Sequence, residues 1–145
     1  MRIRKATDEE TQEILDYALV VLHESAMGFV EPNLEKAYQI MGPILAEGGY
    51  YLIHESNQAI QGWIGVGKMY DFYTDELVGM IPELYVLPPY RHKGIAEKLC
   101  KVAFHHLKEE GIRKVQLNVF AGNSAKKLYK KLGFHDVTTL MEKDI

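Results

Sequence analysis

One stretch, residues 81–111, constrains the fold of this chain more than any other. Apolar residues at Leu84 to Leu87 suit a short strand, and Pro88 and Pro89 end it. A basic loop containing a glycine follows, and then a long amphipathic pattern. A strand, a glycine turn and a helix in this order indicate an α/β arrangement, in which ligands bind at the carboxyl ends of strands.

The amphipathic pattern predicts a helix, because its apolar residues recur on one face and its lysines and glutamates are left for solvent. Gly111 supplies the expected C-terminal stop. Cys100 is the single cysteine, which excludes an internal disulfide, and we interpret it as a packed core thiol. The apolar positions of the helix are Ile95, Leu99, Val102, Ala103 and Leu107.

The loop before this helix predicts an anion site. The first turn of a helix leaves backbone N–H groups without partners, and the helix dipole adds positive charge there. Gly94 has no side chain to block a ligand, while Arg91 and Lys93 add cations that suit a diphosphate. The chain has neither G-x-x-x-x-G-K-[ST] nor G-x-G-x-x-G, which argues against a P-loop and a dinucleotide-binding turn.

Two motifs resemble one known family. The loop reads Arg91-His92-Lys93-Gly94-Ile95-Ala96, which resembles the [RQ]-x-x-G-x-[GA] pyrophosphate turn of the GNAT superfamily of acetyl-CoA-dependent N-acetyltransferases. Further along, the chain reads Asn123-x-Ala125-x-x-x-Tyr129-x-x-Leu132-Gly133-Phe134, which is similar to the N-x-x-A-x-x-x-Y-x-x-x-G-F helix of these enzymes. Here Ala125 follows Asn123 at a spacing of two. The motifs stand in the family's order and cover about residues 81–134.

The resemblance implies a mixed α/β (α+β) fold, with one N-acetyltransferase domain over residues 1–145. Its sheet is expected to be central, mixed and mostly antiparallel, with six to seven strands, a splayed parallel central pair and about four helices on both faces. The length of 145 residues, with 47% hydrophobic and 26% charged residues, fits one compact domain.

Patterns in the first half of the chain predict an edge strand at Ile3 and a helix that begins near Thr7 and presents one apolar face from Ile14 to Leu22. A second helix opens at Pro32-Asn33 and stops at either Gly42-Pro43 or Gly48-Gly49. If the resemblance holds, these helices form a lid over the substrate site. A hairpin follows, and glycines in its second strand predict a bulge or a close backbone approach. The hairpin strands are Tyr50 to Glu55 and Ile60 to Tyr70, and the glycines are Gly62, Gly65 and Gly67.

Pro82 lies inside the apolar run from Leu77 to Leu87 and cannot donate to a sheet ladder. The strand is therefore expected to be bulged or unpaired near this proline. Two interpretations stay open: a parted sheet that leaves backbone groups free for an extended amide ligand such as pantetheine, or a proline in an edge strand. A buried strand at Val115 to Phe120 is expected to run parallel to this one. The helix Ser124 to Leu132 follows, and Phe134 to Lys143 suits one bent or two short strands.

The resemblance also implies which residues contact acetyl-CoA, the co-substrate. Asn123 would either cap the last helix or bond the pantetheine. Several lysines on that helix form a basic face, which is usually solvated surface, although one of them could approach the 3′-phosphate. The coenzyme-binding residues implied are Leu84, Tyr85, Val86, Arg91, His92, Lys93, Gly94, Ile95, Ala96, Asn123 and Tyr129.

Acetyl transfer from a thioester to an amine needs a base for the ammonium proton and a proton donor for the leaving thiolate. Glu83 is the candidate base, since the family often places a glutamate on the disrupted strand; the alternative is a solvent-facing strand glutamate. Tyr129 is the candidate proton donor, and the alternative is a packed structural tyrosine. The resemblance implies that a backbone N–H near Leu84 to Val86 binds the oxyanion. The expected function is direct acetylation of a primary amine on a small molecule or peptide, and the rival is a non-catalytic acyl-CoA sensor.

Charge and composition restrict the kinds of partner that the chain is expected to bind. The net charge of −3 gives no general attraction for nucleic acid, and no apolar run is long enough to span a membrane, so we expect a cytoplasmic protein. The histidines lack metal-ligand spacing, so no metal is expected. Dimerisation is left open, and a homodimer is compatible with the sequence. Acidic residues expected near the mouth of the site suggest a cationic substrate: Glu31, Asp71, Asp75, Glu76 and Glu83.

Overall fold

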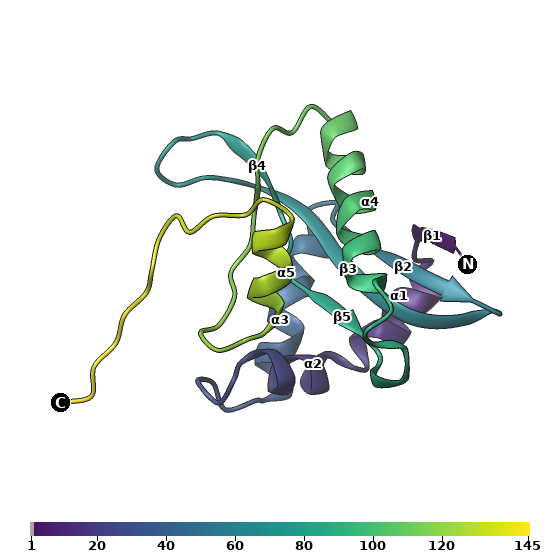
Figure 1. Ribbon diagram of the computed structural model, residues 1–145, viewed down its shortest axis with the longest axis horizontal. Helices are drawn as coiled ribbons and strands as arrows, with labels where there is room; N and C mark the ends of the chain where they lie inside the picture. Colours follow the sequence, from purple (N-terminus) through teal and green to yellow (C-terminus); the bar gives the residue numbers. More distant parts are fainter. Residues whose placement is uncertain (1) are drawn as a thin grey trace.

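The computed structural model describes residues 2–145, and Figure 1 labels its elements. In chain order they are β1 (Arg2–Lys5), α1 (Asp8–Leu15), α2 (Ala18–Ser25), α3 (Leu34–Ala46), β2 (Tyr50–Ser56), β3 (Ala59–Tyr70), β4 (Leu77–Met80), β5 (Leu84–Val86), a 3-10 turn (Pro88–Tyr90), α4 (Ile95–Glu109), β6 (Val115–Gln116) and α5 (Ala125–Lys131).

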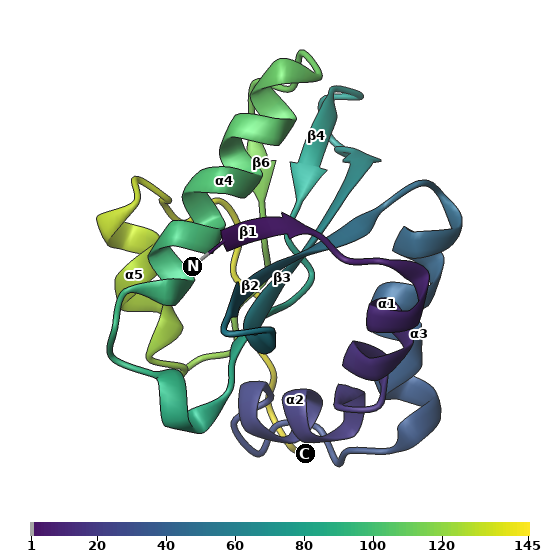
Figure 2. The same ribbon diagram turned by 90° about the vertical axis from the view of Figure 1, so that its right-hand side faces the viewer.

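The strands form one six-stranded sheet in the order β1-β2-β3-β4-β6, and β5 pairs with β3. Every pairing is antiparallel except that of β4 with β6, which is parallel. Figure 2 shows α4 and α5 on one face of the sheet and α1, α2 and α3 on the other. The expected mixed, mostly antiparallel sheet with one parallel pair is therefore confirmed.

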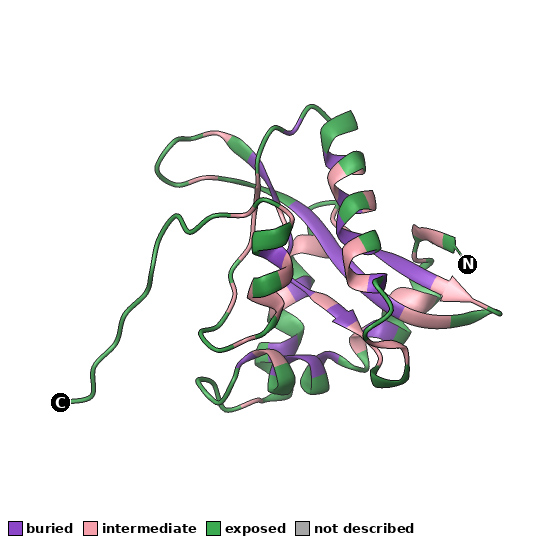
Figure 3. Cartoon of the chain, viewed as in Figure 1, coloured by how far each residue is buried: buried purple, intermediate pink, exposed green. Residues whose placement is uncertain are grey.

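Each face of the sheet has its own apolar core, because strand residues alternate between the two faces. Under α4 and α5, Leu52, Ile64 and Leu99 are fully buried together. Under α1 to α3, Tyr51 and Trp63 lie in a second cluster with Ile14, Met41, Ile53 and Tyr85. Figure 3 shows the buried residues running along the central strands between these layers.

The single helix expected from Thr7 onward is wrong, because the chain breaks into α1 and α2 at Asp16 and Tyr17. A capping box between Thr7 and Glu10 starts α1 as expected. At its end the N–H of Tyr17 bonds the carbonyl of Ile14 at 2.9 Å, which tightens the last turn and redirects the chain. The break lays the Tyr17 ring against Trp63, with 5.5 Å between ring centroids.

The second helix passes through Gly42-Pro43, so the earlier of its two expected stops is wrong. Pro43 lacks an N–H, but the following turn still forms, and Glu47 N–H bonds its carbonyl at 3.2 Å. The helix ends before Gly48-Gly49, where Gly48 has φ +92°. The later stop is therefore confirmed, in agreement with the usual role of glycine after a helix.

The glycines of β3 mark close backbone approaches, as expected, and one of them gives a stability prediction. A Cβ on Gly62 would lie 2.9 Å from the backbone oxygen of Tyr85, whereas one on Gly42 in α3 would meet nothing within 4 Å. We expect Gly62→Ala to destabilise the fold by about 1–3 kcal/mol through overpacking. Gly42→Ala should instead stabilise it by up to about 1 kcal/mol, through helix propensity.

Urea unfolding monitored by circular dichroism measures both changes. Equal effects of the two substitutions, or a stabilising effect of Gly62→Ala, would contradict the close packing of β3 against β5.

Two predictions for the C-terminal part are wrong. The strand expected at Val115 to Phe120 ends at Gln116, because β4 stops at Met80 and leaves the rest of that segment without a strand beside it. No strand forms at Phe134 to Lys143 either. Phe134 packs on the core, and the residues after it extend away from the body of the molecule, as the yellow segment of Figure 1 shows.

Candidate functional site

The strand that contains Pro82 is interrupted, as the sequence predicts. Strand β4 pairs with β3 from Gly67 onward, and β5 pairs with β3 at Gly62 to Ile64. Together β4 and β5 form one interrupted strand alongside β3. The register changes across residues 81–83, which indicates a bulge at the proline. On the other side, the N–H of Ile81 bonds the carbonyl of Gln116 at 3.1 Å, close to the last residue of β6.

Beyond this bond no hydrogen bond between backbone groups joins β5 to the segment after β6 within residues 2–145, which leaves a gap in the hydrogen bonding of the sheet. Strand β5 bonds β3 through Glu83 and Leu87, since Gly65 N–H reaches the Glu83 carbonyl at 2.8 Å and Leu87 N–H reaches the Gln61 carbonyl at 2.9 Å. Hydrogen bonding alternates along an antiparallel strand, so the backbone groups of Leu84 and Val86 point the other way, into the gap. Within residues 2–145 their N–H groups have no hydrogen-bond partner.

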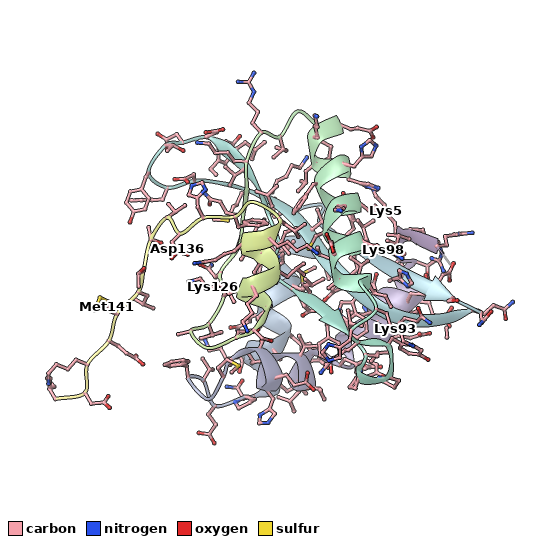
Figure 4. All side chains as sticks on the ribbon, in the orientation of Figure 1. Lys5, Lys93, Lys98, Lys126, Asp136 and Met141 are labelled. Carbon is pink, nitrogen blue, oxygen red and sulfur yellow. The ribbon has the colours of Figure 1, made fainter. Side chains whose placement is uncertain are left out.

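The turn before α4 presents a second set of free backbone donors. Gly94 adopts the left-handed conformation, with φ 80°, and no side chain caps the helix. In the described chain, no bond is made by the N–H groups of residues 92–97, whereas Arg91 N–H bonds the Pro88 carbonyl at 3.3 Å. The Lys93 side chain lies beside this turn (Figure 4), with its Nζ 6.0 Å from the centre of the Tyr90 ring. Such a cluster of amides at a helix N-terminus suits a phosphate anion.

The Arg91 side chain is bonded within the protein. Its Nε donates to the Val86 carbonyl at 2.8 Å, and its guanidinium pairs with Glu24 of α2 at 2.8 Å. It also lies over the ring of Tyr85, at 5.1 Å from the ring centre. The expectation that this cation is simply free to meet a diphosphate is therefore revised. Arg91 ties the turn to β5 and α2, and the groups without partners at the turn are the backbone amides.

Glu83 is buried, with only 8% of its surface exposed, so the alternative of a solvent-facing strand glutamate is wrong. Its Oε2 accepts a hydrogen bond from the indole Nε1–H of Trp63 at 2.7 Å. Burial raises the pKa of this carboxyl to about 6, although the Trp63 N–H and the nearby Tyr51 phenol stabilise the charged form. A carboxylate with such a pKa can accept a proton near neutral pH.

Tyr129 lies on α5 and belongs to the core of the opposite sheet face, beside Phe134 at 5.7 Å between ring centroids. Its hydroxyl has no hydrogen-bond partner in residues 2–145. Burial is the main reason that the pKa of this phenol rises to about 12, with a smaller contribution from Cys100. A phenol with a raised pKa stays protonated and keeps its O–H available as a donor.

Asn123 precedes Ser124, the N-cap residue of α5, and its side chain bonds the first N–H of the helix. Its Oδ1 accepts from the N–H of Ala125 at 2.9 Å, and its Nδ2 donates to the carbonyl of Ser25 at the end of α2 at 3.3 Å. The loop after α2 also contacts the loop before α5, because the rings of Phe29 and Phe120 stack with their centroids 6.1 Å apart. The segment after α2 therefore contacts the segment before α5, beside the gap.

Of the acidic residues expected at one mouth, Glu83 lies beside the gap, whereas Asp71 and Glu76 lie elsewhere. Asp71 accepts a hydrogen bond from Gln116 at 2.7 Å, and Glu76 pairs with Lys114 at 3.3 Å. Both belong to the loop between β3 and β4, which Figure 1 shows at the opposite end of the sheet from the turn before α4. Charge at the site therefore gives no support for a strongly cationic substrate.

The structure adds residues that the sequence did not identify. Glu24 joins α2 to the turn, since besides Arg91 it accepts from the Tyr85 hydroxyl at 3.2 Å. No local pattern could have found it, because its partners lie more than sixty residues away, on other elements. Trp63 and Tyr51 surround Glu83, but the sequence identified them only as strand residues. The alternation of side chains along the two strands could have predicted that both lie on one face of the sheet.

Residues 2–145 contain neither a cluster of metal-ligating side chains nor a helix that could span a membrane. No group of three or more histidine, cysteine, aspartate or glutamate side chains is arranged to hold a metal ion. No helix in that range is both long enough and apolar enough to cross a bilayer.

Comparisons with known proteins agree with this geometry. A model of the acetyltransferase (GNAT) family matches residues 16–134. The uncharacterized N-acetyltransferase YjgM of Escherichia coli (strain K12) is 29% identical over 108 residues, which cover 74% of this chain and 62% of that protein. The chain thus spans less than two thirds of that relative.

Solved structures share the fold. A putative acetyl transferase from Pyrococcus furiosus has a TM-score of 0.84 at 21% identity, over 99% of both chains. A predicted acetyltransferase with acetyl-CoA from Clostridium acetobutylicum has a TM-score of 0.76 at 23% identity, over 99% of this chain and 95% of that one.

Proposed function

The chain belongs to the acetyltransferase (GNAT) family, and on that premise we propose that it transfers an acetyl group from acetyl-CoA to a primary amine of a small molecule or peptide. The observation that carries the proposal is the gap between β5 and the segment after β6, which has free amides along one side and leads to the amides of the turn. A diphosphate fits the turn, and an extended pantetheine arm fits the strand edge.

In this proposal the coenzyme supplies the activated acetyl group, and the residues of the chain bind and move protons. The N–H groups of residues 92–97 hold the diphosphate. The N–H groups of Leu84 and Val86 hold the pantetheine arm, and one of them donates to the oxyanion that develops on the acetyl carbonyl. Arg91 fixes the turn relative to β5 and α2, since its side chain bonds both the Val86 carbonyl and Glu24 of α2.

Glu83 and Tyr129 lie on opposite faces of the sheet and serve as base and proton donor. Glu83 accepts the proton of the ammonium, directly or through water, so that the amine attacks the carbonyl carbon. A C–N bond forms, the second nitrogen proton passes to solvent, and the C–S bond breaks. The Tyr129 hydroxyl gives its proton to the departing thiolate and regains one from solvent. No covalent enzyme intermediate is required.

Two measurements test the proposal. Calorimetry should show saturable binding of acetyl-CoA, and a thiol assay should show release of coenzyme A in the presence of at least one amine from a diverse panel. Binding without release for every amine would favour a non-catalytic acyl-CoA sensor. Absence of binding at high micromolar coenzyme would contradict both functions.

The free hydroxyl of Tyr129 gives a further prediction. Tyr129→Phe should lower kcat by about 10- to 100-fold, because a hydrogen bond to a charged group is worth about 1.5–3 kcal/mol. Since the hydroxyl has no internal partner in the described chain, the unfolding temperature should stay unchanged. Thiol-release kinetics and a thermal melt measure the two quantities. An unchanged kcat would assign Tyr129 to packing alone.

A further inference from the structure

Glu24 of α2 bonds two side chains of the candidate site at once. Its Oε1 accepts a hydrogen bond from the Tyr85 hydroxyl at 3.2 Å, and its Oε2 accepts one from the Arg91 guanidinium at 2.8 Å. Figures 1 and 2 show α2 at the same end of the molecule as the turn before α4. One carboxylate, from a helix on the other face of the sheet, therefore contacts both the turn and β5.

The two partners of Glu24 are also fixed to each other. The Arg91 guanidinium lies over the Tyr85 ring, 5.1 Å from the ring centre, and its Nε donates to the Val86 carbonyl at 2.8 Å. Tyr85 is only 7% exposed and belongs to β5, so its ring cannot move without the strand. The carboxylate thus completes a small network that spans two sets of donors, the amides of β5 that face the gap and the amides of residues 92–97.

As an ion pair alone, Glu24 and Arg91 contribute little to the fold. Their side chains are 40% and 37% exposed, and water screens a pair that is this open. Within residues 2–145, however, no other acidic side chain pairs with Arg91, and no other group accepts from the Tyr85 hydroxyl. Loss of Glu24 would leave both groups free to turn, which changes the geometry of the site more than the stability of the fold.

We propose that Glu24 is a positioning residue for acetyl-CoA: through Arg91 and Tyr85 it holds the turn and β5 at the spacing that lets one coenzyme bond both sets of amides. The inference rests on the proposed function, since it concerns the same coenzyme. A ligand that bonds several donors binds more tightly when those donors are already held in place. Glu24 holds them without contacting the coenzyme, because it bonds side chains and leaves the amides to the ligand.

Charge and position predict opposite results when the carboxylate is removed. A negative charge beside the turn opposes a diphosphate, so its neutralisation alone should tighten the binding of acetyl-CoA. Loss of positioning should weaken it. Glu24→Gln separates the two effects. Glutamine keeps the length of the side chain, but one of its two terminal groups is an NH₂, which cannot accept the bond from Tyr85 or Arg91.

Calorimetry with acetyl-CoA on the full chain measures the result. We expect Glu24→Gln to raise the dissociation constant about 3- to 10-fold. At saturating coenzyme and amine, kcat should stay within about twofold, because the variant keeps the base and the proton donor. The matched control is Glu110→Gln, which breaks an ion pair of similar exposure with Lys68 beyond the far end of α4 and should leave the affinity unchanged.

A second variant tests whether Glu24 acts through Arg91. Arg91→Met keeps the apolar stem of the side chain and removes the group that Glu24 bonds. In the double variant the fold-change in affinity should be smaller than the product of the two single fold-changes, because both substitutions remove the same contact.

The inference is overturned if Glu24→Gln binds acetyl-CoA as tightly as the native chain or more tightly, since Glu24 would then act on stability or charge alone. It is also overturned if the two single fold-changes multiply in full. Absence of binding by the native chain is a different result, because it overturns the proposed function itself and the inference with it.

Discussion

Glu83→Gln should lower kcat by about 10²- to 10⁴-fold, the range expected when a positioned general base is removed. Glutamine keeps the size of the side chain and can still accept the Trp63 N–H bond, which measures 2.7 Å in the native protein. It cannot take the ammonium proton. The loss should therefore appear in kcat, while the dissociation constant for acetyl-CoA stays within about threefold. Steady-state kinetics and calorimetry separate the two quantities.

The control is Glu9→Gln, an exposed position in the first turn of α1, which should leave kcat unchanged. If Glu83→Gln retains native turnover at neutral pH, the base is another group or bulk water. The proposed binding of acetyl-CoA would then still stand, but the assignment of Glu83 as the general base would be wrong.

The pH profile follows from the pKa of Glu83, which burial raises to about 6. Only the carboxylate form accepts a proton, so log(kcat/KM) should fall as the pH drops through about 6 and level off above it. Trp63→Phe removes a hydrogen bond that stabilises the carboxylate, so the pKa should rise and the acid limb should move to higher pH. The stability contribution has the opposite sense to that of an ordinary ion-paired acid. Because the folded-state pKa is raised, this contribution is fully present below the ordinary value of 4.5 and is lost as the pH rises through about 6.

The second large effect concerns binding at the turn. Gly94 has φ +80°, a conformation that costs residues with a Cβ about 1–2 kcal/mol, and a β-branched residue more. Gly94→Val should therefore move the loop out of this conformation and misalign the amides of residues 92–97. We expect the dissociation constant for acetyl-CoA to rise about 10- to 100-fold, measured by calorimetry.

The matched control is Gly111→Val at the other end of α4, where φ is +83° and a Cβ also meets nothing within 4 Å. Both substitutions impose the same backbone strain on the same helix, so both should lower the unfolding temperature. Only Gly94→Val should weaken binding. Equal affinities in the two variants would show that the turn does not hold the coenzyme.

The parts of the site that depend on consecutive residues could be predicted from the sequence. The interrupted strand follows from Pro82 and the helix stop from Gly111, because each is a local backbone requirement. The helix break at Asp16 and Tyr17 could not be predicted, because apolar spacing continues across it and only packing of Tyr17 on Trp63 reveals it.

Contacts between residues far apart in the sequence could not be predicted either. The role of Arg91 depends on Glu24, an acid with no distinguishing local pattern, and their pairing appears only when α2 packs beside β5. The C-terminal residues have a composition typical of strands, which is why the sequence predicted a strand there. Strands form in pairs, however, and composition does not say where the partner lies.

Hydrogen exchange at single backbone amides, with and without saturating acetyl-CoA, tests the central claim most directly. Coenzyme should slow exchange at Leu84, Val86 and residues 92–97, whose N–H groups have no partner within residues 2–145. Amides in β1, far from the gap, should exchange at unchanged rates. Unchanged exchange at the gap and the turn, with protection elsewhere, would show that the acetyl donor does not bind there.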